Sequence, residues 1–135
     1  MVIAAPPSAF RAGERWRYRA PEGFEQSRIL IGAVASFAGI EPIVCCAVLD
    51  APRLLPDGRI DRITIPFLPL TAGAMRATVV AHDGEGALPE DFGRAFSQWH
   101  EDPRGLAAFT VAFDGRLDLL IARQMAEIAG QEDPG

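Results

Sequence analysis

Two neighbouring segments are apolar on both of their alternating faces, and this property restricts the possible folds more than any other feature of the sequence. Residues 28–37 read RILIGAVASF, and residues 43–49 read IVCCAVL, with a turn at 39–42 between them. A β-strand that is apolar on both faces belongs in a sheet that is covered on both sides. We therefore expect two paired strands in a sheet with two buried faces.

Other segments in the first 81 residues also have the two-residue period of strands. Residues 14–20 alternate, with Trp16 and Tyr18 on one face and Arg15, Arg17 and Arg19 on the other. Residues 51–58 contain two prolines and an Asp-Gly pair, which is typical of a hairpin connection. A fourth strand follows, and residues 75–80 can form a fifth before a glycine-rich loop at 82–86.

After residue 88 the period becomes helical. In residues 89–101, Phe92, Phe96 and Trp99 are spaced i, i+4 and i+7 on one stripe. The final element has Asp114 as a possible cap and Gly130 as a possible stop. Its apolar stripe consists of Leu117, Leu120, Ile121, Met125 and Ile128. Between these two helices, residues 106–113 fit either a strand or a buried helical turn.

The order of elements predicts an α+β protein, with an antiparallel sheet or small open barrel of about five strands followed by two C-terminal amphipathic helices. We expect one domain over residues 1–135, with a loose arm at 1–8, a mainly β part at 10–81 and a mainly α part at 88–130. Two helices can cover only one face of such a sheet. The sheet must therefore curl on itself or bury its other face against a second copy, so a homodimer is expected.

The composition excludes several kinds of chemistry. All 13 basic residues are arginine, and the 135 residues include neither lysine nor asparagine. The chain therefore cannot form a lysine Schiff base, a Walker-type phosphate site or a serine–lysine dyad. A GC-rich genome explains both absences and favours a bacterial origin.

Three features of the sequence favour a cytoplasmic location. The first residues do not resemble a signal peptide, and no apolar run reaches the roughly 18 residues of a membrane-spanning helix. Cys45 and Cys46 are adjacent within an apolar strand, where two buried thiols fit better than a redox pair or a soft-metal site. We expect no cofactor and no membrane partner.

The first candidate site is an arginine face. Arg15, Arg17 and Arg19, with Trp16 beside them, could bind anions, because guanidinium groups bind carboxylates and phosphates well. The alternative is a solvated face on an edge strand. The net charge is −5, and the chain from residue 82 onward contains eleven carboxylates but only four arginines. This balance opposes general nucleic-acid binding.

The second candidate is the segment Pro66, Phe67, Leu68 and Pro69. Its prolines cannot donate hydrogen bonds to a ladder and favour an edge or a bulge. Such an edge can present apolar side chains to a partner protein. The alternative is a bulged strand whose side chains fill the core.

The third candidate is a metal site. His82, Asp83 and Glu85 lie in one predicted loop, and His100 could complete a two-histidine, one-carboxylate set. The alternatives are an ordinary polar turn and, for His100, a charged imidazole at a helix C-terminus. Templates for nucleophilic catalysis each lack at least one required residue.

The last third of the chain carries a resemblance. It contains Phe92, then Phe96-x-x-Trp99, then a GxAAFTV run at 105–111 and a closing amphipathic helix. In this part the chain resembles the ending of short uncharacterised bacterial proteins. Such families have no assigned activity, so the resemblance implies a small bacterial α+β protein and no functional residue.

These observations favour a non-catalytic binding or interaction module that acts as a homodimer or as a subunit, with self-association or another protein as its partner. A small metal-dependent enzyme or metal-binding protein using His82, Asp83, Glu85 and His100 is the alternative. A third hypothesis is RNA or nucleotide binding through the arginine face.

Overall fold

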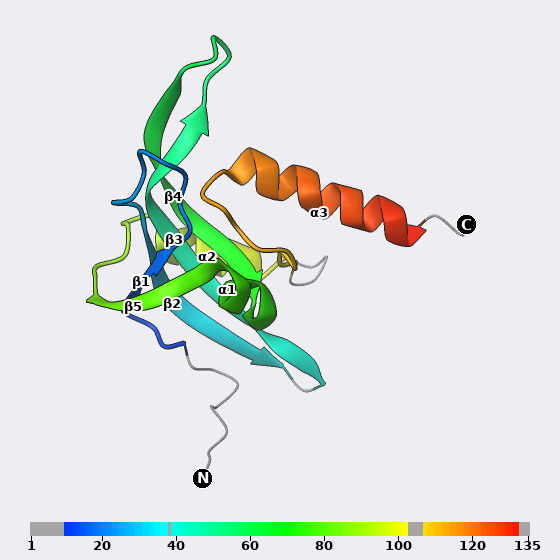
Figure 1. Ribbon diagram of the computed structural model, residues 1–135. Coiled ribbons are helices and arrows are strands. Elements are labelled where there is room, and N and C mark those ends of the chain that lie inside the picture. Colours follow the sequence, from blue (N-terminus) through cyan, green and yellow to red (C-terminus); the bar gives the residue numbers. More distant parts are fainter. Residues whose placement is uncertain (1–9, 38, 103–106, 133–135) are drawn as a thin grey trace.

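The computed structural model describes residues 10–37, 39–102 and 107–132, and the predicted arm at 1–8 lies outside them (Figure 1). The described residues form five strands and three helices. In chain order these are β1 Glu14–Tyr18, β2 Arg28–Phe37, β3 Ile40–Leu54, β4 Ile60–Thr71, α1 Ala72–Thr78, β5 Val79–Glu85, α2 Phe92–His100 and α3 Leu117–Glu132. None of these helices is long and apolar enough to cross a lipid bilayer.

The strands make one antiparallel sheet in the order β4-β3-β2-β1-β5. The first four strands follow one another as a meander. Helix α1 then carries the chain from β4 at one edge to β5, which pairs with β1 at the other edge. An open five-stranded antiparallel sheet followed by helices confirms the α+β class.

The hairpin between β3 and β4 is longer than the sequence suggested. The predicted connection at 51–58 is strand as far as Leu54, and the turn is confined to residues 55–59. There Leu55 N donates to Arg59 O at 2.7 Å, and Gly58 has a φ of 89°, which favours glycine. The hairpin therefore projects from the body of the protein (Figure 1).

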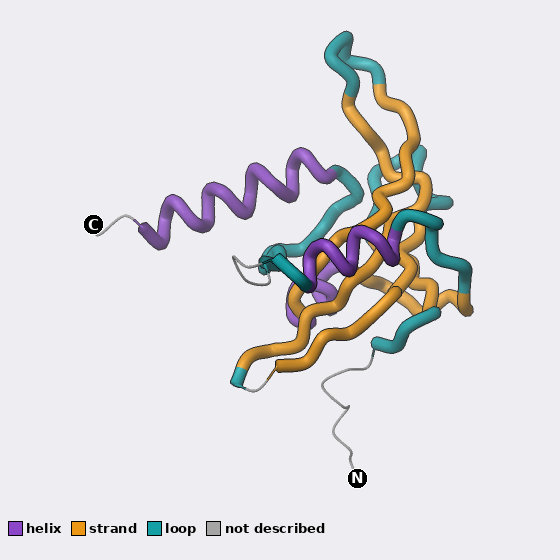
Figure 2. The backbone as a smooth tube through the Cα atoms, turned by 180° about the vertical axis from the view of Figure 1, so that it is seen from behind, coloured by secondary structure: helices purple, strands orange, loops and turns teal. Residues whose placement is uncertain are grey.

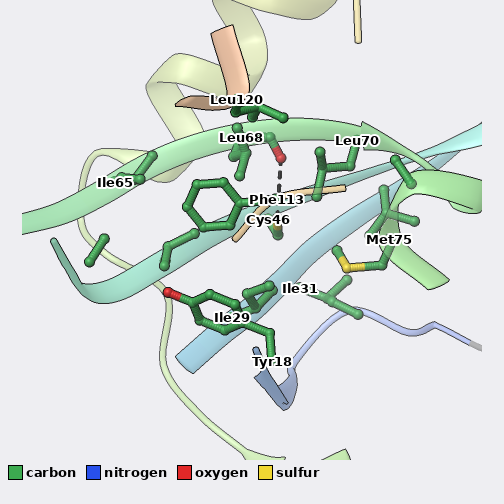
Figure 3. Close-up of a cluster of buried hydrophobic side chains, with 14 of the residues drawn as sticks. Tyr18, Ile29, Ile31, Cys46, Ile65, Leu68, Leu70, Met75, Phe113 and Leu120 are labelled. Carbon is green, nitrogen blue, oxygen red and sulfur yellow. Dashed lines mark hydrogen bonds between the residues drawn. The ribbon is translucent and has the colours of Figure 1, made fainter. Parts of the chain in front are cut away.

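The larger core lies on one face of the sheet, where α1, residues 107–113 and the start of α3 cover it (Figure 3). Its fully buried members include Ile29, Ile31, Cys46, Leu68, Leu70, Met75, Phe113 and Leu120. The Thr78 hydroxyl joins two of these covering segments, because it donates to Ala74 O at 2.7 Å and accepts from Phe113 N at 2.9 Å.

A smaller core lies on the opposite face, under α2. It contains Ile43, Cys45, Ala47 and Phe92. Because Val44, Cys46 and Val48 belong to the larger core, β3 is buried on both faces, with no residue from Ile43 to Val48 more than 5% exposed. A single chain thus covers both faces of the sheet at this point. The apolar strands β2 and β3 therefore do not by themselves require a second copy of the chain.

The prediction of a strand at 75–80 is wrong for residues 75–78. These residues belong to helix α1, whose first turn is capped by Thr71: its hydroxyl accepts a hydrogen bond from Ala74 N at 3.2 Å. Strand β5 consequently runs through Glu85, so most of the predicted glycine-rich loop at 82–86 is strand.

Three further sequence predictions concern the end of the last helix, residues 106–113 and the prolines of β4. Gly130 does not stop the last helix, which continues to Glu132. Residues 107–113 form neither a continuous strand nor a helix, and Leu106 lies outside the described residues. Within this segment Phe109 makes a single parallel bridge to Leu70. The two prolines of β4 lie on an edge strand, as predicted.

Candidate functional site

Arg15 of the predicted arginine face and Arg28 of β2 both contact Asp83 of β5. Arg28 Nε donates to Asp83 Oδ2 at 2.7 Å, and Arg15 Nε donates to Asp83 O at 2.8 Å. Arg15 Nε also lies 3.4 Å from Asp83 Oδ2. The three residues come from adjacent strands, so this cluster ties β5 and β2 to β1. Strand β1 is therefore interior to the sheet and not an edge strand.

The predicted anion-binding set is not assembled as one surface. Arg17 is exposed on β1, Arg19 is exposed beyond its end, and Trp16 lies on the opposite face, with its ring centroid 5.2 Å from that of His82. A cavity of about 310 Å³ adjoins the cluster. It is lined by Arg15, Gln26, Arg28, Leu49, Asp50 and Asp83. Two carboxylates balance its two guanidinium groups, so the cavity offers an anion no net positive charge.

The Asp83 cluster predicts a pH effect on stability. The hydrogen bond from Arg28 holds the pKa of the Asp83 carboxyl below its ordinary value, and the charges of Arg15 and Arg17 act in the same direction. A lowered folded-state pKa means stabilisation that is complete above the unfolded value of about 3.9 and is lost as the pH falls through the folded value. We expect Asp83→Asn to lower the thermal midpoint at pH 7, and the gap to the parent protein to narrow below about pH 4.

Differential scanning fluorimetry across pH 2–8 measures this gap. Asp57→Asn, in the hairpin turn beside its partner Arg59, is the control and should lower the midpoint less, since both side chains of that pair are largely exposed. A gap between parent and Asp83→Asn that stays constant down to pH 2 would contradict the assignment.

The four metal candidates are not brought together. His82 and Asp83 are neighbours in a strand and point to opposite faces: His82 Nε2 lies 3.8 Å from Glu14 Oε2, whereas Asp83 faces the arginines. His100 is the last residue of α2, and its ring centroid lies 5.8 Å from that of Phe96. Among the described residues, no group of three or more histidine, cysteine or acidic side chains could hold a metal ion.

The two thiols are buried on opposite faces of β3, as the sequence predicted. Burial raises the pKa of Cys45 to about 12 and raises that of Cys46 as well. Cys46 Sγ donates to Leu68 O at 3.2 Å. At neutral pH these thiols are protonated and therefore poor nucleophiles.

The β4 candidate divides between the two faces of its strand. Phe67 and Pro69 line an open groove, Leu68 is 1% exposed and belongs to the larger core, and Pro66 is exposed. The strict two-residue period is interrupted here, because the β3–β4 ladder shifts register between Ile65 and Leu68, and both of these side chains are buried in the larger core. Of the four residues of the predicted interface segment, Leu68 thus contributes to the core, Phe67 and Pro69 form part of the wall of a groove, and Pro66 faces solvent.

The groove has a volume of about 540 Å³ and a mainly apolar surface. It is lined by Phe67, Pro69, Ala95, Gln98, Trp99, Asp102, Ala107, Ala108, Phe109 and Gln124. The ring centroids of Phe67 and Trp99 are 5.6 Å apart, so β4 and α2 meet along one side. We call this site the aromatic groove.

Hydrogen bonds fix the far wall of the aromatic groove. Phe109 N donates to Pro69 O at 3.0 Å, and Thr71 N donates to Phe109 O at 3.0 Å, which attaches the segment to the β4 edge. The Trp99 indole donates to Ala107 O at 2.6 Å. These bonds fix the position of the segment that forms this wall, and ligand sites are commonly built from such preformed walls.

Helix α3 closes one end of the aromatic groove. Gln124 Oε1 accepts hydrogen bonds from Thr110 N at 2.8 Å and from Thr110 Oγ1 at 3.1 Å. In the sequence, Trp99 belongs to a helical stripe, and no pattern marks Ala95 or Gln124 as groove residues. The useful signal was the pair of prolines, which placed Phe67 and Pro69 on an edge strand.

Comparison of the chain with protein-family models, with curated proteins and with solved structures finds no match. The functional interpretation therefore depends on the residues and the geometry described above.

Proposed function

We propose that this protein is a non-catalytic interaction module, acting as a homodimer or as a subunit of a larger assembly, whose aromatic groove receives apolar side chains of a partner protein. The observation that carries the proposal is the groove itself. It lies on the edge strand that the sequence marks as an interface, and its walls are fixed by hydrogen bonds between four elements.

The size and lining of the groove indicate the chemistry of the occupant. A volume of about 540 Å³ is in the range of ordinary ligand sites and accommodates a few apolar side chains. Deep pockets lined by aromatic side chains receive the anchor residues that dominate many protein interfaces. The best fit is a partner segment with large apolar anchors.

Charge adds a second requirement. The chain from residue 82 onward has eleven carboxylates and four arginines, and Glu101 stands at the C-terminal end of α2, two residues after the groove residue Trp99. A partner segment with basic residues beside its anchors would be attracted to this region and oriented by it. We therefore propose an apolar anchor with basic flanks as the recognised feature.

The two other functional hypotheses have less support. The metal hypothesis needs side chains that lie on different faces and elements, and the nucleic-acid hypothesis needs guanidinium groups that Asp83 partly neutralises. Neither is favoured by a specific contact among the described residues.

A peptide titration tests the proposal. Blocked heptapeptides with a central Phe-Phe, Leu-Leu or Ala-Ala pair between arginines would be titrated into Trp16→Phe protein, so that Trp99 alone reports binding. We expect the Phe-Phe and Leu-Leu peptides to bind at least about tenfold more tightly than the Ala-Ala peptide, since each tenfold change needs only about 1.4 kcal/mol.

Two substitutions in α2 distinguish peptide binding in the groove from binding elsewhere on the surface. Ala95→Leu extends a side chain into the groove and should weaken Phe-Phe peptide binding about tenfold or more. Ser97→Leu adds the same side chain at an exposed position outside the groove and should leave binding unchanged. Equal affinity for all three peptides, or no detectable binding of any of them at millimolar concentration, would contradict the proposal.

A further inference from the structure

A second apolar surface lies on the hairpin and on α3, away from the aromatic groove. Of the six large apolar side chains that are most exposed among the described residues, five belong to these two elements. They are Leu54 (48% exposed), Ile60 (51%), Leu119 (37%), Ile121 (41%) and Met125 (64%). Such a concentration on two elements differs from the scattered exposed apolar residues of an ordinary monomer surface.

A groove separates the two elements. It has a volume of about 310 Å³ and lies where α3 begins, beside the β3–β4 hairpin. It is lined by Pro52, Arg53, Leu54, Ile63, Leu117, Asp118 and Ile121. Figures 1 and 2 show the hairpin and α3 projecting from the body as two separate arms. We call this site the hairpin groove.

Helix α3 presents an apolar ridge next to this groove. Ile121 and Met125 are spaced i, i+4 and share one side of the helix, whereas Leu120 points into the larger core. A 16-residue helix is only marginally stable in water by itself, and its stability normally comes from packing an apolar face. The exposed ridge is therefore the part of α3 that would gain most from a partner.

We propose that a second copy of this chain covers this surface, with the Met125 end of the ridge of each α3 packed against the hairpin side of the other copy's groove, next to the Ile121 that lines it. The inference rests on the homodimer part of the proposed function and assigns it a surface. A two-fold interface requires one patch that complements itself. This chain carries a ridge and a groove side by side, which meets that requirement.

The charges favour the same pairing. Residues 53–62 of the hairpin contain three arginines and two aspartates, whereas residues 117–132 of α3 contain one arginine and three carboxylates. Arg53 and Arg59 are paired with Asp61 and Asp57 inside the hairpin, which leaves the hairpin a net charge of +1 against −2 on α3. Contact between hairpin and helix is therefore attractive, whereas alignment of two α3 helices along their whole length would bring like charges together. Charge complementarity therefore selects hairpin-to-helix contact between copies.

Sedimentation equilibrium tests the inference on the full chain. We expect the parent protein to be a dimer at micromolar concentration, and Met125→Glu and Leu54→Glu each to weaken the dimer about tenfold or more. Both side chains are exposed, so neither substitution should disturb folding. Val80→Glu is the matched control, because Val80 is 60% exposed on β5, outside the patch, and should leave the mass unchanged.

A cross-linking experiment tests which elements meet. Leu54→Cys and Met125→Cys proteins would be mixed and treated with a short bismaleimide, since the buried native thiols are protonated and shielded. Mixed dimers joined between positions 54 and 125 support the inference. Linked Met125→Cys homodimers in the absence of mixed dimers would overturn it.

The outcomes separate this inference from the proposed partner site. A parent protein that stays monomeric at 100 µM overturns the self-association surface, and peptide binding in the aromatic groove would still stand. A dimer that Met125→Glu leaves intact overturns it as well. Ala95→Leu, which fills the aromatic groove, is expected to leave the dimer mass unchanged.

Discussion

Phe92→Ala is expected to lower the free energy of unfolding by about 3–5 kcal/mol, because a buried aromatic ring is removed and a cavity is left in the core. Phe92 is 5% exposed and is the α2 side chain that closes the smaller core over Ile43, Cys45 and Ala47. Its ring also lies 5.6 Å from that of Phe67, between centroids. Urea denaturation followed by circular dichroism measures the loss.

The reciprocal substitution is Gly32→Ala on β2. A Cβ at Gly32 would overlap the ring of Phe92, so the glycine allows α2 to pack closely on the sheet. We expect Gly32→Ala alone to cost about 1–3 kcal/mol, as overpacked cores do. In the Phe92→Ala background the overlapping ring is gone, so most of this cost should disappear, and the double-mutant cycle should show coupling of opposite sign to the single costs.

Gly93→Ala is the control for this cycle. Gly93 lies in α2 next to Phe92, and a Cβ there would meet no atom within 4 Å. Because alanine favours a helix more than glycine does, we expect this variant to be as stable as the parent or more stable by up to about 1 kcal/mol. An equal cost for Gly32→Ala with and without Phe92 would show that the ring and the glycine do not depend on each other.

The fold could be predicted where a segment has one clear period or is a continuous apolar run of strand length. The apolar runs at 28–37 and 43–49 became β2 and the centre of β3, and the stripe of Phe92, Phe96 and Trp99 became α2. Helix α1 escaped prediction because its seven residues span only two turns between strands. The sequence signal that would have found it is Thr71, whose side chain caps the helix.

The candidate sites were harder to predict because they combine distant segments. Asp83 was assigned to a loop, so its hydrogen bond to Arg28, 55 residues away, could not be foreseen. The aromatic groove depends on Phe109 pairing with the β4 edge and on Gln124 reaching Thr110. Periodicity describes the faces of single elements, but it does not say which faces meet.

Leu120→Ala is expected to lower the free energy of unfolding by about 2–5 kcal/mol and to loosen α3, because Leu120 is the fully buried contact between this helix and the larger core. Figure 3 shows Leu120 beside Leu68, on the covered face of the sheet. Hydrogen exchange of the α3 amides measures the loosening, and urea denaturation measures the energy.

Leu119→Ala is the matched control, because Leu119 is the neighbouring residue of the same helix and is 37% exposed. It should cost less than about 1 kcal/mol and leave α3 protected from exchange. Leu120→Ala should also weaken the proposed dimer, because a helix without its anchor no longer holds Ile121 and Met125 beside the hairpin. If the α3 amides of Leu120→Ala exchange as slowly as those of the parent protein, the helix is held by contacts other than Leu120, and this account of its attachment fails.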